Sequence, residues 1–260
     1  MSTSCPYEYQ ECLDMDQIGE PTQNQRLEGF NILLGLTEAV GTILVILVIS
    51  WINYHRNGLS WGADPDTKFN WHPLLMVVGF VFLYANAMLL YRIQRNVRKR
   101  RLKLMHAGLM LFIIVLVIIS LVAVFDNHNM KKIPNMYSLH SWVGLTSIIL
   151  FCCQWVAGCI SFLYPGLQGN LRASYMPIHV YFGNAGFIGV LVSCLLGLNE
   201  KAIFQLKEKY AQFVGEGVMI NIIGIFIIVF GGLTMYLVSQ NQYKRLPRPE
   251  DDVLLTRTND

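Results

Sequence analysis

The sequence predicts an all-α membrane protein with six transmembrane helices, and three observations support this. The 260 residues are 53% hydrophobic and 14% charged, with a mean hydropathy of +0.41, whereas about a quarter of the residues of an ordinary soluble domain are charged. Six apolar runs are long enough to cross a bilayer core, which takes about 20 helical residues. A basic segment, YRIQRNVRKRRLKLMH, separates two of these runs. The net charge of +3 is small, and the Lys and Arg residues are concentrated in this one segment. Nucleic-acid binding therefore has little support.

The six apolar runs form a single domain. They lie at roughly 30–52, 71–91, 104–125, 139–163, 176–198 and 217–239. Backbone groups in lipid must be hydrogen-bonded within their own segment, so we expect each run to be a helix. We expect a transmembrane domain at 30–240, a polar N-terminal tail at 1–29 without a cleavable signal peptide, and a C-terminal tail at 241–260.

The basic segment at 91–106 predicts the orientation. It contains seven Lys or Arg and no acid, and such clusters stay on the cytosolic side of a membrane. Alternation of the helices then puts both tails in the cytosol. That side carries thirteen Lys or Arg against seven on the other, so the count agrees.

Each of the four middle helices begins with a histidine. His72 and His140 begin helices at the non-cytosolic face, and His106 and His179 begin helices at the cytosolic face. Histidines are uncommon inside membranes and usually face the interior of a helix bundle. A single one would most often be a hydrogen-bonding residue, but two pairs at matched depths favour a shared function.

Two facing imidazoles are enough to hold a haem. A structural zinc site needs four ligands, and no further ligand of the right type lies near these histidines. Haem iron needs only two axial ligands, and with both positions filled the chemistry is electron transfer. Small residues share a helix face with three of the histidines, although they also suit close helix packing. These residues are Gly79, Gly144, Gly183 and Gly186.

The ordered motifs resemble the cytochrome b561 family of ascorbate-reducible transmembrane ferrireductases. They are NWHP (70–73), AMLLYR (87–92), HAG (106–108), DNHN (126–129), SLHSW (138–142) and PIHVY (177–181). DNHN stands where the family has ENHN, a mild departure. The resemblance covers about 30–240 and implies a four-helix bundle of helices two to five around two b-type haems, usually in a homodimer. It implies that His72 pairs with His140 at the outer haem, and His106 with His179 at the inner haem.

A cationic cluster is expected beside the inner haem. Lys99 and Lys103 precede His106 by seven and three residues, and Arg172 precedes His179 by seven, so they share helix faces with the histidines if the helices extend into the loops. Cytosolic flanks are basic for topology alone. The resemblance favours an ascorbate site made by Arg92, Lys99, Lys103 and Arg172.

The acceptor site is expected in the non-cytosolic loops. His55 and His128 lie in loops beside the outer haem, with Asn127 and Asn129 near the second. Loop histidines are usually only solvated, but imidazole is a plausible iron ligand. The resemblance makes this the site for ferric iron or monodehydroascorbate. Phe204, expected in the loop before helix six, is a candidate to cover it.

Other features leave alternatives open. Glu38, inside the first helix, is a functional candidate or a residue that pairs with a neighbour. Residues 250–255, EDDVLL, fit an acidic-dileucine sorting pattern, so the home membrane is endolysosomal, secretory-vesicle or plasma membrane. A metal-ion or proton transporter would use the histidines as relays, but few membrane acids are available. A haem-bearing quinone oxidoreductase would need a quinone pocket.

Overall fold

The computed structural model describes residues 27–246 and confirms the predicted fold class. Six helical segments are long and apolar enough to span a membrane, and there is no strand among the described residues. They are α3 (Phe30–His55), the segment Pro65–Ile93, α7 (Lys99–Lys131), α8 (Leu139–Phe162), α9 (Gly169–Leu206) with η2 (Lys207–Gln212), and α10 (Gly215–Ser239). The dileucine pattern at 250–255 lies outside the described residues.

The second span changes its helical winding next to a histidine. It consists of α4 (Pro65–Phe69), α5 (Trp71–Leu75), the π-helical η1 (Met76–Leu83) and α6 (Tyr84–Ile93). Pro73 has no N–H to donate to the helix, and π-helical turns occur where the regular hydrogen-bond pattern is interrupted. The wider turns begin at Met76, one turn after His72, and π-bulges are frequent at functional sites.

Two helices extend further than their apolar runs predict. The sequence places the DNHN motif in a loop, but α7 continues to Lys131 and includes Asp126–Asn129. The loop position expected for Phe204 is also wrong, because α9 continues to Leu206. Hydropathy ends a predicted span where polar residues begin, whereas the helix continues as long as its polar turns find partners. Lys68, for example, donates to the Asp126 carboxylate at 2.6 Å.

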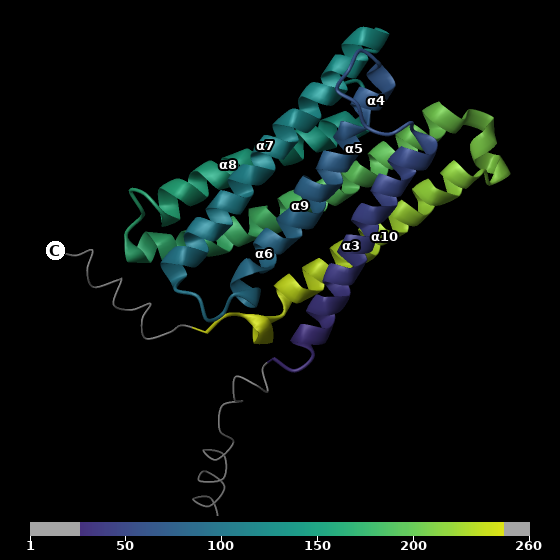
Figure 1. Ribbon diagram of the computed structural model, residues 1–260. Coiled ribbons are helices and arrows are strands. Elements are labelled where there is room, and N and C mark those ends of the chain that lie inside the picture. Colours follow the sequence, from purple (N-terminus) through teal and green to yellow (C-terminus); the bar gives the residue numbers. More distant parts are fainter. Residues whose placement is uncertain (1–26, 247–260) are drawn as a thin grey trace, which may run out of the picture.

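The helices form a four-helix bundle with a flanking pair (Figure 1). The second span packs on α7, α7 packs on α8, α8 lies along α9, and α9 returns to η1. Helices α3 and α10 pack along each other and cover α6 and α9. The start of α3 and the end of α10 lie at the same end of the bundle (Figure 1), as an even number of spans requires.

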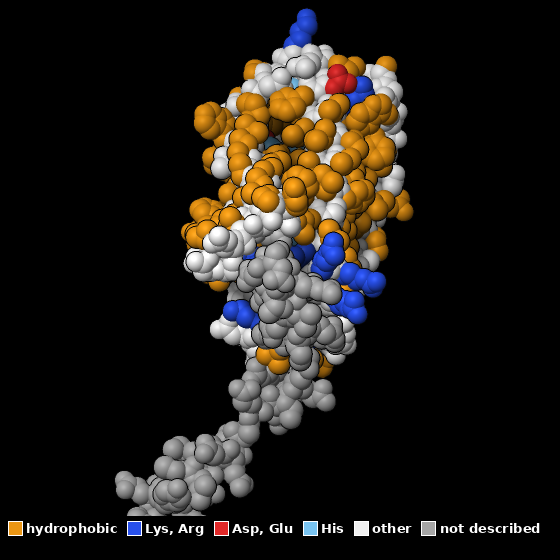
Figure 2. Space-filling model, turned by 90° about the vertical axis from the view of Figure 1, so that its left-hand side faces the viewer, with side chains coloured by type: hydrophobic (Ala, Val, Ile, Leu, Met, Phe, Trp, Pro, Cys, Tyr) orange, Lys and Arg blue, Asp and Glu red, His pale blue; other side chains and the backbone are white. Residues whose placement is uncertain are grey.

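The surface is apolar around the middle of the bundle. One face carries a continuous hydrophobic band, with Lys and Arg gathered beyond its lower end (Figure 2). Large apolar side chains on α7, α8 and α9 point outward, among them Phe112, Ile149 and Val192. Such a band suits lipid and not water. The chain is therefore an integral multi-pass membrane protein.

Candidate functional site

The structure brings the four predicted histidines together in two pairs. The expectation that each one begins its helix is wrong for two of them, because α7 begins at Lys99 and α9 at Gly169, so that His106 and His179 lie inside their helices. His72 on α5 faces His140 on α8, with ring centroids 6.1 Å apart and planes at 90°. His106 on α7 faces His179 on α9, with centroids 6.4 Å apart and planes at 71°. The pairs lie toward opposite ends of the bundle, which is the arrangement that their positions in the sequence predict.

The spacing within each pair fits one metal ion between two imidazoles. A metal–imidazole bond is about 2 Å long, and the ring centre lies roughly 1 Å beyond the nitrogen, so two ligated rings have centroids about 6 Å apart. Both observed spacings agree. No group of three or more His, Cys, Asp or Glu side chains is placed to hold a metal anywhere in residues 27–246. Two-ligand haem iron therefore suits these residues better than zinc.

Hydrogen bonds at Nδ1 orient three of the four rings. His140 Nδ1 lies 2.8 Å from the Ser193 carbonyl oxygen, and His106 Nδ1 lies 2.9 Å from that of Ala87. His72 Nδ1 lies 3.0 Å from the Ser120 hydroxyl. A carbonyl only accepts, so the Nδ1 of His106 and His140 carries the proton, and their Nε2 is left free to bind a metal.

Two glycines that sequence reasoning missed lie against the histidine rings. A Cβ at Gly197 on α9 would come within 2.8 Å of His140 Cε1, and one at Gly158 on α8 within 3.0 Å of His179 Cε1. Each glycine follows the histidine of its own helix by eighteen residues, which is five turns at 3.6 residues per turn. Each helix thus presents a histidine and, on the same face, the glycine that makes room for the other helix's histidine. The spacing of eighteen residues between histidine and glycine was the signal in the sequence that could have identified these two glycines.

The glycines singled out from the sequence have packing roles in the structure. A Cβ at Gly144 would come within 2.9 Å of the Ser193 hydroxyl, and one at Gly79 within 3.0 Å of Leu116. Gly186 faces the hydroxyl of Tyr84, which donates to the Gly183 carbonyl at 2.9 Å. Gly79, Gly144 and Gly186 therefore permit close approach of helices, which was the alternative interpretation, whereas a Cβ at Gly183 would meet nothing within 4 Å.

An aromatic cluster fills the bundle between the two histidine pairs. The Phe151 ring meets Phe80 at 5.0 Å and Tyr84 at 4.7 Å, both edge to face. Tyr84 also meets Phe187 at 5.4 Å. All four side chains are buried. The two sites are therefore separated by buried aromatic rings in contact with one another.

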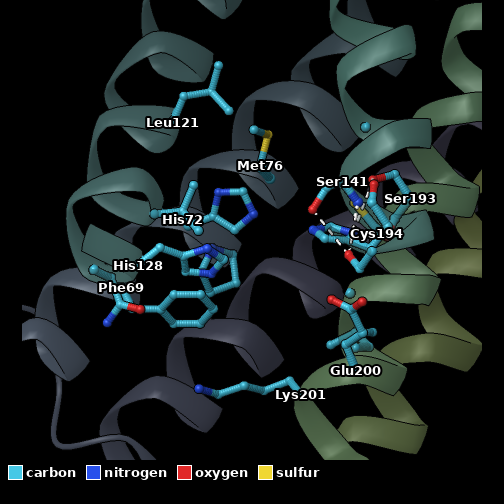
Figure 3. Close-up of a pocket in the computed structure, with 18 of the residues that line it drawn as sticks. Phe69, His72, Met76, Leu121, His128, Ser141, Ser193, Cys194, Glu200 and Lys201 are labelled. Atoms are coloured by element: carbon cyan, nitrogen blue, oxygen red, sulfur yellow. Dashed lines mark hydrogen bonds between the residues drawn. The ribbon is translucent and has the colours of Figure 1, made fainter. Parts of the chain in front are cut away.

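A cavity of about 340 Å³ opens beside the outer pair (Figure 3). His72 and His140 line it together with His128, Lys201 and Phe204. In Figure 3, His128 lies next to His72 and Phe69 on one wall, and the Lys201 side chain extends alongside the Phe69 ring. The Lys201 ammonium lies 4.3 Å from the centre of the Phe69 ring. A predicted acceptor residue, His128, therefore stands beside the outer pair, although it belongs to α7 and not to a loop.

The other two predicted acceptor residues, His55 and Asn127, have different surroundings. His55 is the exposed last residue of α3, does not line the cavity, and comes near Gly215 at the start of α10. Asn127 borders the cavity but is buried, and its amide donates to the Pro65 carbonyl at 2.6 Å. It fastens α4 to α7. The grouping of His55 with His128 in one site is therefore not observed.

Three of the four predicted cytosolic cations gather near the inner pair. Lys103 donates to the Phe162 carbonyl at 3.0 Å, and its charge interacts with those of Arg172 and Lys99. The Phe162 ring lies 5.4 Å from His179. Helix α7 begins at Lys99, as the shared-face argument requires. The cluster thus adjoins the inner histidines.

Arg92 does not belong to this cluster. Its guanidinium is buried and donates to the backbone carbonyls of Val238 and Gln240, the latter at 2.5 Å. These carbonyls end α10, where the last helical carbonyls have no partner of their own. Arg92 therefore joins α6 to α10, and its guanidinium points to the end of α10 and not to the cluster around Lys103.

Comparison with known proteins identifies the family. The sequence profile of eukaryotic cytochrome b561 matches residues 71–205. The chain belongs to the cytochrome b561 family. It is 40% identical over 234 residues to transmembrane ascorbate-dependent reductase CYB561 of Homo sapiens, covering 90% of each chain. It is 45% identical over 229 residues to plasma membrane ascorbate-dependent reductase CYBRD1 of Rattus norvegicus, covering 86% of this chain and 80% of the relative.

The family match encloses the candidate site. Residues 71–205 include all four paired histidines, the cationic cluster, His128, and the two glycines that face the rings. They exclude His55. The named relatives of this cytochrome b561 are reductases, so the chain is a membrane oxidoreductase of that family.

Proposed function

We propose that this cytochrome b561 carries electrons across its membrane from cytosolic ascorbate, through two haem b groups per chain, to ferric iron or monodehydroascorbate on the other side. The observation that carries the proposal is the presence of two facing imidazole pairs with metal-binding spacing at opposite ends of one bundle. His72 and Ala87, whose carbonyl meets His106, are fifteen residues apart on one span, a length that would be about 22 Å in a regular α-helix. Haem iron with two imidazole ligands supplies one-electron transfer, because it has no open position for other chemistry.

The protein's part is to hold and shield the two sites. His72 and His140 would hold the outer haem, and His106 and His179 would hold the inner one. Hydrogen bonds at Nδ1 orient three of the four rings, and Gly197 and Gly158 leave room for one ring each. The Tyr84–Phe151 cluster excludes water between the sites. One electron leaves the donor at the cytosolic face, and one acceptor is reduced at the other.

The donor site is the cationic cluster at the inner pair. Ascorbate is an anion at neutral pH, and a group of cations raises its local concentration. Lys99, Lys103 and Arg172 supply that charge next to the Phe162–His179 contact. The relatives in human and rat are named ascorbate-dependent reductases, which supports the choice of donor.

The acceptor site is the mouth of the outer cavity. His128 offers an imidazole beside His72, and Phe204 and Lys201 also line the cavity. Ferric iron binds imidazole, and an organic anion suits the ammonium of Lys201. Both acceptors fit this mixed surface.

The wider assignments follow the same proposal. The basic segment puts both termini in the cytosol, with the domain at 30–240 between tails at 1–29 and 241–260. Lipid surrounds the apolar band, and a homodimer in an endolysosomal, secretory-vesicle or plasma membrane is the expected state.

The test is the absorbance spectrum of the purified protein before and after ascorbate. We expect about two haems per chain, reduced by ascorbate with a b-type α band. His106→Ala should lose the inner haem and abolish reduction of ferric iron across a vesicle membrane. A colourless protein from haem-replete cells, or a fully loaded and active His106→Ala variant, would overturn the proposal.

A further inference from the structure

The two outer histidines share a hydrogen-bond arrangement that the inner ones lack. A serine on a neighbouring helix meets each outer ring: Ser120 of α7 meets His72, and Ser193 of α9 meets His140. The Ser120 hydroxyl lies 3.0 Å from His72 Nδ1 and 3.3 Å from the His72 carbonyl oxygen. The Ser193 hydroxyl lies 3.2 Å from His140 Nδ1 and 3.3 Å from the His140 carbonyl oxygen. The same serine–histidine contact therefore occurs twice, once between α7 and α5 and once between α9 and α8.

The direction of these hydrogen bonds follows from the groups involved. A carbonyl oxygen only accepts, so each serine hydroxyl donates its proton to the histidine carbonyl. The hydroxyl oxygen then has lone pairs left for the Nδ1–H of the same histidine. Both serines are buried, so water does not compete for these bonds. Each serine therefore accepts from the outer ring and fixes its Nε2 toward the partner ring.

The inner histidines have weaker support. His106 Nδ1 meets only the Ala87 carbonyl, at 2.9 Å, and the buried Nδ1 of His179 has no hydrogen-bond partner within the described chain. An acceptor at Nδ1–H makes an imidazole a stronger electron donor to its metal and favours the oxidised metal. The outer ligands therefore have more of this support than the inner ones.

We propose that Ser120 and Ser193 are positioning residues that lower the reduction potential of the outer haem relative to the inner one. The inference rests on the proposed function, because it needs haem on these histidines. It assigns a role to two residues that do not themselves contact the metal, acting through hydrogen bonds to its ligands.

The distances rank the two serines. At His72 the hydroxyl oxygen, at 3.0 Å, is closer than the Ser120 carbonyl, at 3.4 Å. At His140 the Ser193 carbonyl, at 2.8 Å, is closer than the hydroxyl, at 3.2 Å. Removing the Ser120 hydroxyl leaves His72 with only a long bond, whereas His140 keeps its shorter one. The loss at position 120 should therefore matter more.

The experiment is a spectroscopic redox titration of the full-length haem-loaded protein and its serine variants. We expect Ser120→Ala to raise the midpoint potential of one of the two haem transitions and leave the other in place. Ser193→Ala should raise the same transition by less, and the double variant by more than either. The matched control is Ser147→Ala, because Ser147 is also buried and lines the outer cavity, but donates to the Val143 carbonyl on its own helix at 2.8 Å.

The outcomes separate this inference from the proposed function. Two haem transitions in the parent and in Ser147→Ala uphold the function. If both transitions then stay at their parent potentials in Ser120→Ala and Ser193→Ala, the serines are only structural and the inference is overturned. A shift of both transitions together in either variant also overturns it, because that result reports a general disturbance. A parent protein without haem overturns both.

Discussion

Gly197 on α9 lies against the imidazole of His140 on α8, so that a Cβ at position 197 would come within 2.8 Å of Cε1 and 2.9 Å of Nδ1. Something must move to admit a methyl group there, and the closest atoms belong to the ring. We predict that Gly197→Ala displaces His140 and lowers the haem content to about one per chain. The measurement is the ratio of haem to protein, together with the ascorbate-reduced α band.

Two further alanines calibrate this prediction. Gly158→Ala places its methyl 3.0 Å from His179 Cε1, a milder approach, so the inner site should lose less haem than the outer site loses in Gly197→Ala. Gly232→Ala on α10 meets nothing within 4 Å and should retain both haems. Full haem content in Gly197→Ala would show that the ring has room to move and would refute the argument.

The sequence predicts the spans and the histidine pairs well because both follow from one-dimensional patterns. Hydropathy over about 20 residues identifies a membrane helix, and alternating direction puts His72 level with His140 without any knowledge of packing. The role of Arg92 follows from no such pattern. Its partners at Val238 and Gln240 are about 150 residues away, and a basic residue beside a membrane span looks the same in the sequence whether it faces a substrate or a helix end.

The outer mouth shows the same limit. His55 and His128 both look like loop residues near the outer haem, but α7 continues two turns beyond its apolar run and carries His128 to the cavity wall. His55 ends α3, which belongs to the flanking pair with α10. Membership of the bundle or of the flanking pair is decided by helix packing, which periodicity does not encode.

Arg92 should contribute more to the stability of the fold than to the binding of ascorbate. Arg92→Ala leaves the end of α10 without the donors that now reach two carbonyls, and a buried unpaired polar group costs about 1–3 kcal/mol. We predict a thermal unfolding midpoint lower by several degrees in detergent, with the KM for ascorbate changed less than twofold. The measurements are thermal unfolding followed at the haem band and steady-state reduction by ascorbate. A large rise in KM with an unchanged midpoint would instead return Arg92 to the ascorbate site.

Lys103 and Arg172, in contrast to Arg92, should contribute to the binding of ascorbate. Each neutral variant, Lys103→Gln or Arg172→Gln, removes one charge of the cluster beside His179. We predict a rise in the KM for ascorbate of about tenfold, which corresponds to about 1.4 kcal/mol, and a weaker dependence of the rate on ionic strength. Arg100→Gln is the matched control. It removes the same single charge, and Arg100 is exposed in the same basic segment. Equal effects in all three variants would mean that only the net charge of this face matters.

Asp64 should make the stability of the outer mouth depend on pH. It caps α4, accepting from the backbone N–H of Asp66 at 3.1 Å and of Thr67 at 3.3 Å. Hydrogen bonding with the Thr67 side chain and then with Asp66 holds the pKa of this carboxyl below its ordinary value of 3.8. The folded pKa lies below the unfolded one, so the cap stabilises fully above the ordinary pKa and loses this contribution as the pH falls through the folded value.

We therefore predict that Asp64→Ala has a lower unfolding midpoint than the parent at neutral pH, and that the gap closes as the pH falls below about 4. Asp64→Asn is the control, because asparagine caps a helix as well as aspartate does but does not titrate. Its midpoint should follow the parent at neutral pH and exceed it in acid. Thermal unfolding at matched pH values, followed by circular dichroism, makes the comparison. If the difference in unfolding midpoint between the parent and Asp64→Ala is the same in acid as at neutral pH, the negative charge of Asp64 does not contribute to the stability of the cap.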